Sequence, residues 1–267
     1  MAADRGSLAG EASALLAVAQ RDLTKLLRDR VRLGVSLAFP ILLIAGLGTA
    51  LQPTVGQATG LDSVTLMFTG VLAATLFQST AAGMMSLIED RETDFSQELF
   101  VAPISRVTIV SGKVLGETLV ALVQGVGVVV FALLFKVHPG PGQLVALVLP
   151  CLACCLLGGA FGLATLATLP NQRAALQVFP FLILPQYFFA GVIAPLRGLP
   201  QWLDVVSWAM PLRYPVNLVR AAFYAGHPGY GASVAESPLL DIAVMTGLFC
   251  VLLIAGAALL NHRERSR

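Results

Sequence analysis

Residues 89–106 read EDRETDFSQELFVAPISR, and they lie between two long apolar runs at about 64–88 and 108–135. The stretch holds five of the chain's 15 acidic residues, and a sixth, Glu117, follows nearby. Each run has the ~20 residues that are needed to cross ~30 Å of hydrocarbon. Because a charged helix between two spans is poorly suited to lipid, the stretch predicts a surface connection that a soluble partner can bind.

The composition of the chain is that of a polytopic membrane protein. Of its 267 residues, 57% are hydrophobic and 12% are charged, whereas about a quarter of a soluble domain is charged. Mean hydropathy is +0.81. We expect an all-α membrane protein with a cytoplasmic N-terminus at 1–32, a membrane domain at 33–260 and a cytoplasmic tail at 261–267. The six expected transmembrane helices are about 33–51, 64–88, 108–135, 143–169, 174–194 and 239–260.

Prolines and polar residues predict irregularities in this scheme. Pro40 removes a backbone hydrogen bond from the first span and predicts a kink there. Residues 52–63 predict a short polar loop before the second span. Pro180 and Pro185 predict that the fifth span is not a regular helix throughout its length.

Residues 12–32 have the pattern of an amphipathic helix that lies in the membrane interface. Its apolar positions recur at helical spacing and are Leu15, Leu16, Ala19, Leu23, Leu26 and Leu27. Its polar positions fill the other face and are Gln20, Arg21, Asp22, Lys25, Arg28 and Asp29. The alternative is a solvated N-terminal helix.

Two apolar segments before the last span, at about 199–209 and 213–225, are too short to cross a membrane. They contain Trp202, Trp208, Tyr214, Phe223 and Tyr224, and such aromatic residues prefer the membrane boundary. We expect short re-entrant helices within 196–226 at the outer leaflet. The alternative is a small extracellular helical cap.

The basic residues predict the orientation. With a cytoplasmic N-terminus, six spans place 13 of the 17 Lys and Arg residues inside and leave only Lys136, Arg197, Arg213 and Arg220 outside. This bias puts both termini and residues 89–106 in the cytoplasm. The first residues, MAADRGSLAGEAS, lack the apolar region of a secretory signal peptide, so we expect none.

No sequence pattern predicts a catalytic or metal site. No stretch matches the phosphate-binding pattern G-x-x-x-x-G-K-[ST], and the three histidines lie far apart in loops. Cys151, Cys154 and Cys155 have CxxC spacing within a span, which indicates helix packing rather than a disulfide or a metal site. In the same span, Gly158 and Gly162 form a G-x-x-x-G pattern that predicts the close approach of a neighbouring helix.

Several polar residues lie inside the expected spans, where each costs free energy unless it faces protein or a cavity. Gln78, Ser79 and Thr80 cluster in the second span, and Glu117 and Gln124 lie seven residues apart on one face of the third. One interpretation is a substrate pathway, for which the candidate residues are Gln78, Gln124, Gln186 and Tyr187. The alternative is interhelical hydrogen bonding, with Glu117 reaching the interface or pairing with Lys113 one turn away.

The charged stretch has the features of a short docking helix at 89–104. Phe95, Leu99 and Phe100 form one apolar face, and Pro103 ends the helix. Phe95 and Leu99 are the expected anchors in a groove on a soluble partner. The alternative is a solvated loop that merely connects two spans.

The same stretch resembles the cytoplasmic signature of the type-2 permeases of ATP-binding-cassette (ABC) transporters, which typically reads E-D-R-E-x-G-F-x-x-E-L-L-V-A-P-x-S-R. Asp94 stands where that signature has glycine. Residues 184–224 resemble the family's last extracellular segment, with its L-P-x-W-L and N-P-L-x-Y blocks. The matching residues there are Pro200, Trp202, Leu203, Pro211, Leu212 and Tyr214.

This resemblance implies a transport subunit of the bacterial plasma membrane that is not itself an enzyme. It implies two cytoplasmic ABC ATPase subunits as partners, which bind ATP and Mg²⁺, and a second permease copy or paralogue. No cofactor is expected on this chain, and no nucleic acid is expected as a partner. The implied ATPase-coupling residues are Glu89, Asp90, Arg91, Glu92, Phe95, Glu98, Leu99 and Pro103.

We therefore expect a permease that exports a hydrophobic or amphipathic compound. The alternative cargo is a lipid or a lipid-linked polysaccharide. The alternative from another class is a non-transport membrane protein, such as an integral-membrane enzyme, a scaffold or a sensor. An enzyme would need convergent His, Asp or Glu groups at a membrane surface, whereas the acidic residues here crowd residues 89–106.

Overall fold

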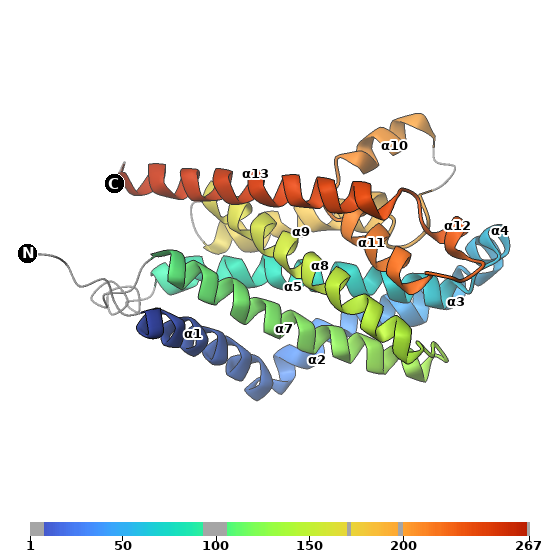
Figure 1. Ribbon diagram of the computed structural model, residues 1–267, viewed down its shortest axis with the longest axis horizontal. Helices are drawn as coiled ribbons and strands as arrows, with labels where there is room; N and C mark the ends of the chain where they lie inside the picture. The colour runs from blue at the N-terminus through green and yellow to red at the C-terminus, as the bar shows by residue number, and fades with distance from the viewer. Residues whose placement is uncertain (1–7, 93–105, 170–171, 197–199, 266–267) are drawn as a thin grey trace, which may run out of the picture.

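The computed structural model describes residues 8–92, 106–169, 172–196 and 200–265, and every regular element in these ranges is a helix (Figure 1). The expected all-α class is therefore confirmed. The elements are α1 (Leu8–Arg28), α2 (Arg30–Leu42), η1 (Leu43–Leu47), α3 (Gly48–Ala50), η2 (Gln52–Gly56), α4 (Gln57–Thr59), α5 (Ser63–Glu92), α7 (Arg106–Leu134), α8 (Pro141–Thr168), α9 (Gln172–Phe189), α10 (Gln201–Trp208), α11 (Arg213–Phe223), α12 (Tyr230–Ser233) and α13 (Pro238–Arg265).

Helix α5 is the centre of the bundle. Its apolar part is 83% buried, whereas the first span is 22% buried and the last is 17% buried. Helices α7, α8, α9 and α11 pack around it. The closest approach is to α8, because a β-carbon at Gly158 or Gly162 would collide with the carbonyl oxygen of Phe77 or Ala81. The G-x-x-x-G pattern predicted this contact.

Five segments of the described chain are long and apolar enough to cross a membrane. They are Leu33–Ala50, Ser63–Met84, Ser111–Leu134, Pro141–Thr165 and Tyr230–Gly256. Helix α9 occupies most of the expected fifth span, but it is not among these five segments.

Two local expectations need correction. The fifth span is not helical throughout 174–194, as expected, but its helix does not break at the prolines, because α9 runs through Pro180 and Pro185 and ends at Phe189. Membrane helices tolerate proline where neighbouring groups satisfy the freed carbonyls. The expected polar loop at 52–63 is mostly helical, because π-helical and α-helical turns continue to Thr59. The chain turns only at Gly60, which adopts a left-handed φ of 69° that a residue with a β-carbon rarely adopts.

The helix ends are arranged in two groups. At one end of the bundle, which is the left end of Figure 1, α1 begins, α5 ends, α7 begins and α13 ends. Helices α3, α4 and α12 and the beginning of α8 lie at the opposite end. Residues 93–105 lie between α5 and α7 in the sequence, and the end of α5 and the beginning of α7 lie at the same end of the bundle as the beginning of α1 and the end of α13.

Helices α10 and α11 closely match the two short segments expected before the last span. Arg213, at the start of α11, is buried and joins them through an ion pair with Asp204 at 3.1 Å. It also pairs with Glu236, and its guanidinium lies 4.5 Å from the ring centre of Trp208. A shared cation therefore fixes α10, α11 and the segment before α13 to one another.

The side chain of Asn217 in α11 makes three hydrogen bonds near Arg213. Its amide nitrogen donates to Oδ2 of buried Asp241 at 2.6 Å and to the carbonyl of Glu236 at 3.1 Å, and its oxygen accepts from the amide of Ala235 at 2.7 Å. Helix α11 is thereby held against the beginning of α13.

Replacing Asn217 with alanine is expected to destabilise the protein by about 3 kcal/mol, because it removes three hydrogen bonds, one of which is donated to the buried carboxylate of Asp241. Thermal unfolding in lipid nanodiscs measures the change. Thr246→Ala is the control, because this exposed hydroxyl donates only to the carbonyl of Ile242 in its own helix. Equal stability of the two variants would contradict the prediction.

Candidate functional site

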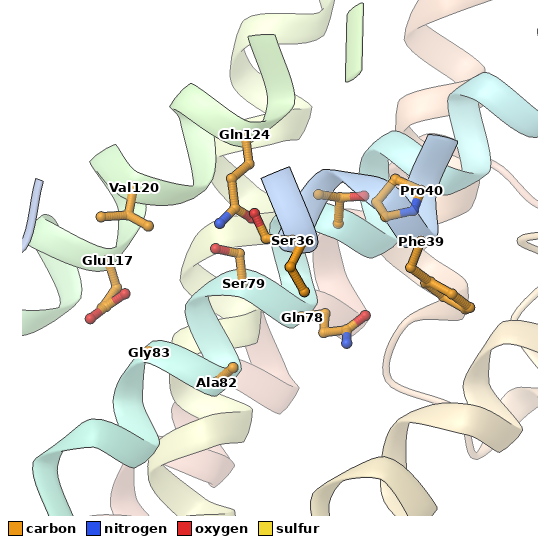
Figure 2. A pocket seen from close by; sticks show the side chains of 12 residues that line it. Ser36, Phe39, Pro40, Gln78, Ser79, Ala82, Gly83, Glu117, Val120 and Gln124 are labelled. Carbon is orange, nitrogen blue, oxygen red and sulfur yellow. The ribbon is translucent and has the colours of Figure 1, made fainter. Parts of the chain in front are cut away.

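A cavity of about 320 Å³ lies between α2, α5 and α7 (Figure 2). Ordinary small-molecule sites have volumes of about 300–1,000 Å³, so this cavity is large enough for part of a ligand. The lining residues are Val35, Ser36, Phe39 and Pro40 of α2; Thr75, Gln78, Ser79, Ala82 and Gly83 of α5; and Glu117, Val120 and Gln124 of α7.

Helical spacing brings the polar residues of two helices to this one cavity. Glu117 and Gln124 are separated by about two turns of α7 and share one face of that helix. The lining residues of α5 follow the same rule, because Gln78, Ser79 and Ala82 recur at positions i, i+1 and i+4. Figure 2 shows the side chain of Gln124 extending from α7 toward the Ser79 hydroxyl on α5.

Tyr187 of α9 supports one wall of the cavity. Its hydroxyl donates a 2.7 Å hydrogen bond to Oε1 of Gln78. Its ring also meets the ring of Phe39 edge to face, with centroids 5.4 Å apart. The hydrogen bond fixes the orientation of the Gln78 amide at the wall of the cavity.

The side chains of Gln124 and Ser79 have no hydrogen-bond partner within the described part of the chain. Gln124 is only 7% exposed. Both side chains line the cavity, so these groups are suited to bind water or a polar ligand there.

One end of the cavity is bounded by a buried ion-pair cluster. The ammonium of Lys113 lies 2.8 Å from Oδ2 of Asp22 in α1 and 2.8 Å from Oε1 of Glu117. All three side chains are at most 6% exposed. The Glu117 carboxylate fits against Gly83, where any β-carbon would collide with it. The cluster thus connects α1, α7 and α5.

The position of Asp22 corrects the expected faces of the N-terminal helix. Asp22 was assigned to the polar face, but it is buried with Ala19 and Leu26 against α7. Gly116 permits this packing, because its β-carbon position is 3.0 Å from Cα of Ala19. Leu16 and Leu27 are 61% and 52% exposed, so part of the apolar surface of α1 remains available to lipid.

Comparison with known proteins identifies the family. The family model for ABC-2 type transporters matches residues 13–224. The chain belongs to the ABC-2 type transporter family. The match includes α2, α5, α7, α8 and α9, and therefore all three helices that line the cavity.

Several known proteins are similar to this permease, over different shares of their length. The transport permease ycf38 of Cyanophora paradoxa is 24% identical over 243 residues, which is 90% of this chain and 84% of the relative. Nodulation protein J of Sinorhizobium fredii is 26% identical over 221 residues, or 79% and 80% of the two chains. The multidrug ABC transporter permease YbhR of Escherichia coli K12 is 24% identical over 140 residues, or 52% and 38%.

The implied coupling residues of the permease lie in and after the last turn of α5. Glu89, Asp90, Arg91 and Glu92 complete this helix, and their side chains are outside the described part of the structure. The other four, Phe95, Glu98, Leu99 and Pro103, are also outside the described residues.

The four candidate pathway residues have different positions. Gln78 and Gln124 line the cavity, and Tyr187 contacts it through Gln78. Gln186 does not line it, because its nitrogen donates to the Leu182 carbonyl at 3.0 Å and its oxygen accepts from the Leu212 amide at 3.1 Å. Gln186 thereby joins α9 to the beginning of α11.

Sequence reasoning missed some of the cavity residues. Ser36 and Phe39 belong to the first span, which has no cluster of polar residues that would predict a cavity there. Thr75 could have been found, because it lies three and four residues before Gln78 and Ser79 and therefore shares their helix face.

Proposed function

We propose that this permease is the membrane subunit of an ABC exporter, which moves a hydrophobic or amphipathic compound out of the cell. A separate ATPase subunit supplies the energy by hydrolysing ATP. The observation that carries the proposal is the cavity of Figure 2, where amide and hydroxyl groups face one another between helices of a membrane protein. Polar groups inside membrane spans mark substrate paths.

The arrangement of the helix ends supports six spans rather than five. Helix α1 begins and α13 ends at the same end of the bundle, so an even number of helices must cross the membrane. Helix α9 supplies the sixth crossing in this proposal. The bias of 13 basic residues against four then places both termini at the cytoplasmic face of a bacterial plasma membrane.

The exposure of the cavity supports a second permease copy or paralogue as a partner. Among the described residues, α2, α5 and α7 provide its walls, and Gln78 and Ser79 remain partly exposed. Lipid cannot form hydrogen bonds with these groups. A second permease that covers this side would close a path between the two chains and shield the polar groups from lipid.

Residues 89–104 are the proposed coupling helix, because they join the bundle at the end that carries both chain termini. In this proposal, two cytoplasmic ATPase subunits bind ATP and Mg²⁺ and close on each other. Their motion reaches the ends of α5 and α7 through the anchors Phe95 and Leu99. Because both helices line the cavity, that motion changes its shape.

Phe95→Asp and Leu99→Asp are expected to release the ATPase, because each places a charge in an apolar contact. The tagged permease is purified with its P-loop ATPase chain, and the bound ATPase and its stimulated turnover are measured. We expect at least a tenfold loss of both, which corresponds to about 1.4 kcal/mol.

Gln97→Asp is the matched control for the coupling test, because it adds the same charge on the other face of the expected helix. It should retain the ATPase. If Phe95→Asp and Leu99→Asp also retained the ATPase with unchanged turnover, the coupling assignment would be wrong.

A lipid or lipid-linked polysaccharide remains the second candidate cargo. The observation in its favour is the pair of side-chain amides, Gln78 and Gln124, in one cavity. An amide both donates and accepts hydrogen bonds and therefore suits the hydroxyl groups of a sugar. Transport assays with each class of compound distinguish the two candidates.

A further inference from the structure

We infer that a second cavity, at the end of the bundle opposite to the chain termini, binds the phosphate group of a phosphate ester. The cavity has a volume of about 360 Å³ and lies where the beginnings of α5 and α8, the connection between α7 and α8 and the end of α11 meet. Its lining residues are Leu61, Thr65, Lys136, Val137, His138, Gln143, Phe223, Tyr224, His227, Pro228 and Gly229. The inference goes beyond the proposed function, because binding at this site requires neither transport nor the ATPase.

Lys136 lines this cavity in a backbone conformation that favours glycine. Its φ is 63°, and the amides of Lys136 and Val137 donate to the carbonyls of Leu133 and Ala132 at 3.2 and 3.1 Å. These two bonds end α7 in the Schellman arrangement, where the residue with positive φ is usually glycine. A left-handed conformation costs a residue with a β-carbon about 1–2 kcal/mol. The turn alone therefore does not explain the lysine, and its ammonium is a candidate ligand-binding group.

Tyr224 supplies a buried hydroxyl that has no partner. The residue is 7% exposed and lines the cavity, and its hydroxyl makes no hydrogen bond within the described part of the chain. A buried tyrosine hydroxyl usually has a partner, because leaving it without one costs about 1–3 kcal/mol. A ligand oxygen at this wall of the cavity supplies the missing acceptor.

The hydrogen bonds of Gln143 determine which nitrogen of His227 is protonated. Oε1 of Gln143 accepts from the amide of Gly140 at 2.8 Å, and its Nε2 donates to the carbonyl of Phe223 at 2.8 Å. The same Nε2 lies 3.3 Å from Nε2 of His227. Because an amide nitrogen only donates, the Nε2 of His227 accepts and its Nδ1 carries the proton. His227 therefore adds an N–H donor to the lining of the cavity.

The charges around the cavity also favour an anion. None of the eleven described lining residues is acidic. Asp62 is the acidic residue nearest to the lining in the sequence, and its carboxylate accepts from the amide of Thr65 at 2.9 Å. Arg220, one helical turn before Tyr224, is 2% exposed, and its Nε has no hydrogen-bond partner among the described residues. The cations Lys136 and Arg220 thus outnumber the one neighbouring carboxylate, and an oxyanion gains charge-assisted hydrogen bonds from the donors here.

The test compares a soluble and a lipid-borne phosphate ester with their uncharged counterparts. The full-length permease in dodecyl maltoside micelles is titrated by calorimetry with glycerol 1-phosphate and with glycerol. Native mass spectrometry measures the binding of phosphatidic acid and of diacylglycerol in the same micelles. We expect at least one phosphate ester to bind about tenfold more tightly than its uncharged counterpart. The ester that does so shows whether the phosphate comes from a soluble compound or from a lipid head group.

Lys136→Gly and Tyr224→Phe test the site without disturbing the fold. Glycine suits a φ of 63° better than lysine does, and the Tyr224 hydroxyl makes no hydrogen bond in the described chain that phenylalanine would remove. Both variants should therefore unfold at or above the temperature of the unaltered permease. Each should lose about tenfold in affinity for the phosphate ester that binds.

Lys25→Gln and Tyr230→Phe are the matched controls for these two variants. Lys25 is exposed on α1 and Tyr230 begins α12, and neither residue lines the cavity. The controls remove a positive charge and a phenolic hydroxyl at other places. They should bind the phosphate ester as the unaltered permease does.

Equal binding of each phosphate ester and its uncharged counterpart would overturn the inference. Unchanged affinity in both Lys136→Gly and Tyr224→Phe would also overturn it, because the phosphate would then bind elsewhere. Neither result bears on the proposed function, which is tested by co-purification of the ATPase with the Phe95 and Leu99 variants. Conversely, those variants should bind the phosphate ester normally, because the cavity lies at the other end of the bundle.

Discussion

Gly158→Leu is expected to prevent folding of the permease. The β-carbon position of Gly158 already lies 2.8 Å from Cα of Phe77, so a leucine side chain has no space unless α8 moves away from α5. Helix α5 cannot yield, because its apolar part is 83% buried among the other helices. Close-packed interiors respond to such overpacking with a cost of about 1–3 kcal/mol or more, and a branched side chain against a backbone lies beyond that range.

Expression and monodispersity after solubilisation measure this effect. Gly247→Leu is the matched control, because Gly247 lies within the last span and has no atom within 4 Å of its β-carbon position. The control should fold normally. Normal yield and unfolding temperature for Gly158→Leu would show that the contact between α5 and α8 is looser than described.

Lys113→Met is expected to destabilise the permease by about 3–5 kcal/mol, because it removes the cation that the buried carboxylates of Glu117 and Asp22 share. Thermal unfolding in nanodiscs measures the change.

Replacing all three charges tests whether the loss comes from unpaired charge. The variant Asp22→Asn with Lys113→Met and Glu117→Gln removes the cluster, and it should recover most of the stability, because neutral groups of similar shape often substitute for buried ion pairs. If this triple variant were as unstable as Lys113→Met, packing rather than charge would explain the loss.

The spans and short helices could be predicted because their signals are local. Helices α7 and α8 lie within two residues of the ranges expected for the third and fourth spans. The ends of α10 and α11 agree equally well, because Pro211 marks a break that a single sequence reveals, although Pro215, the other break expected there, lies inside α11. The face shared by Glu117 and Gln124 was also predictable from their spacing.

The remaining features depend on residues far apart in the chain. Asp22 looks like part of a polar helix face until its partner Lys113 is known, and the two are 91 residues apart. Nor can helical spacing reveal that Tyr187 bonds Gln78, at a separation of 109 residues. The continuity of α9 depends on its neighbours, because its two prolines alone predict an interruption.

The arrangement of the helix ends has an architectural consequence. Helix α1 begins and α13 ends at the same end of the bundle as the connection between α5 and α7. A nucleotide-hydrolysing domain fused through a linker to either terminus would therefore reach that connection without an additional membrane crossing. The scaffold is thus compatible with single-polypeptide half-transporters as well as with separately encoded subunits.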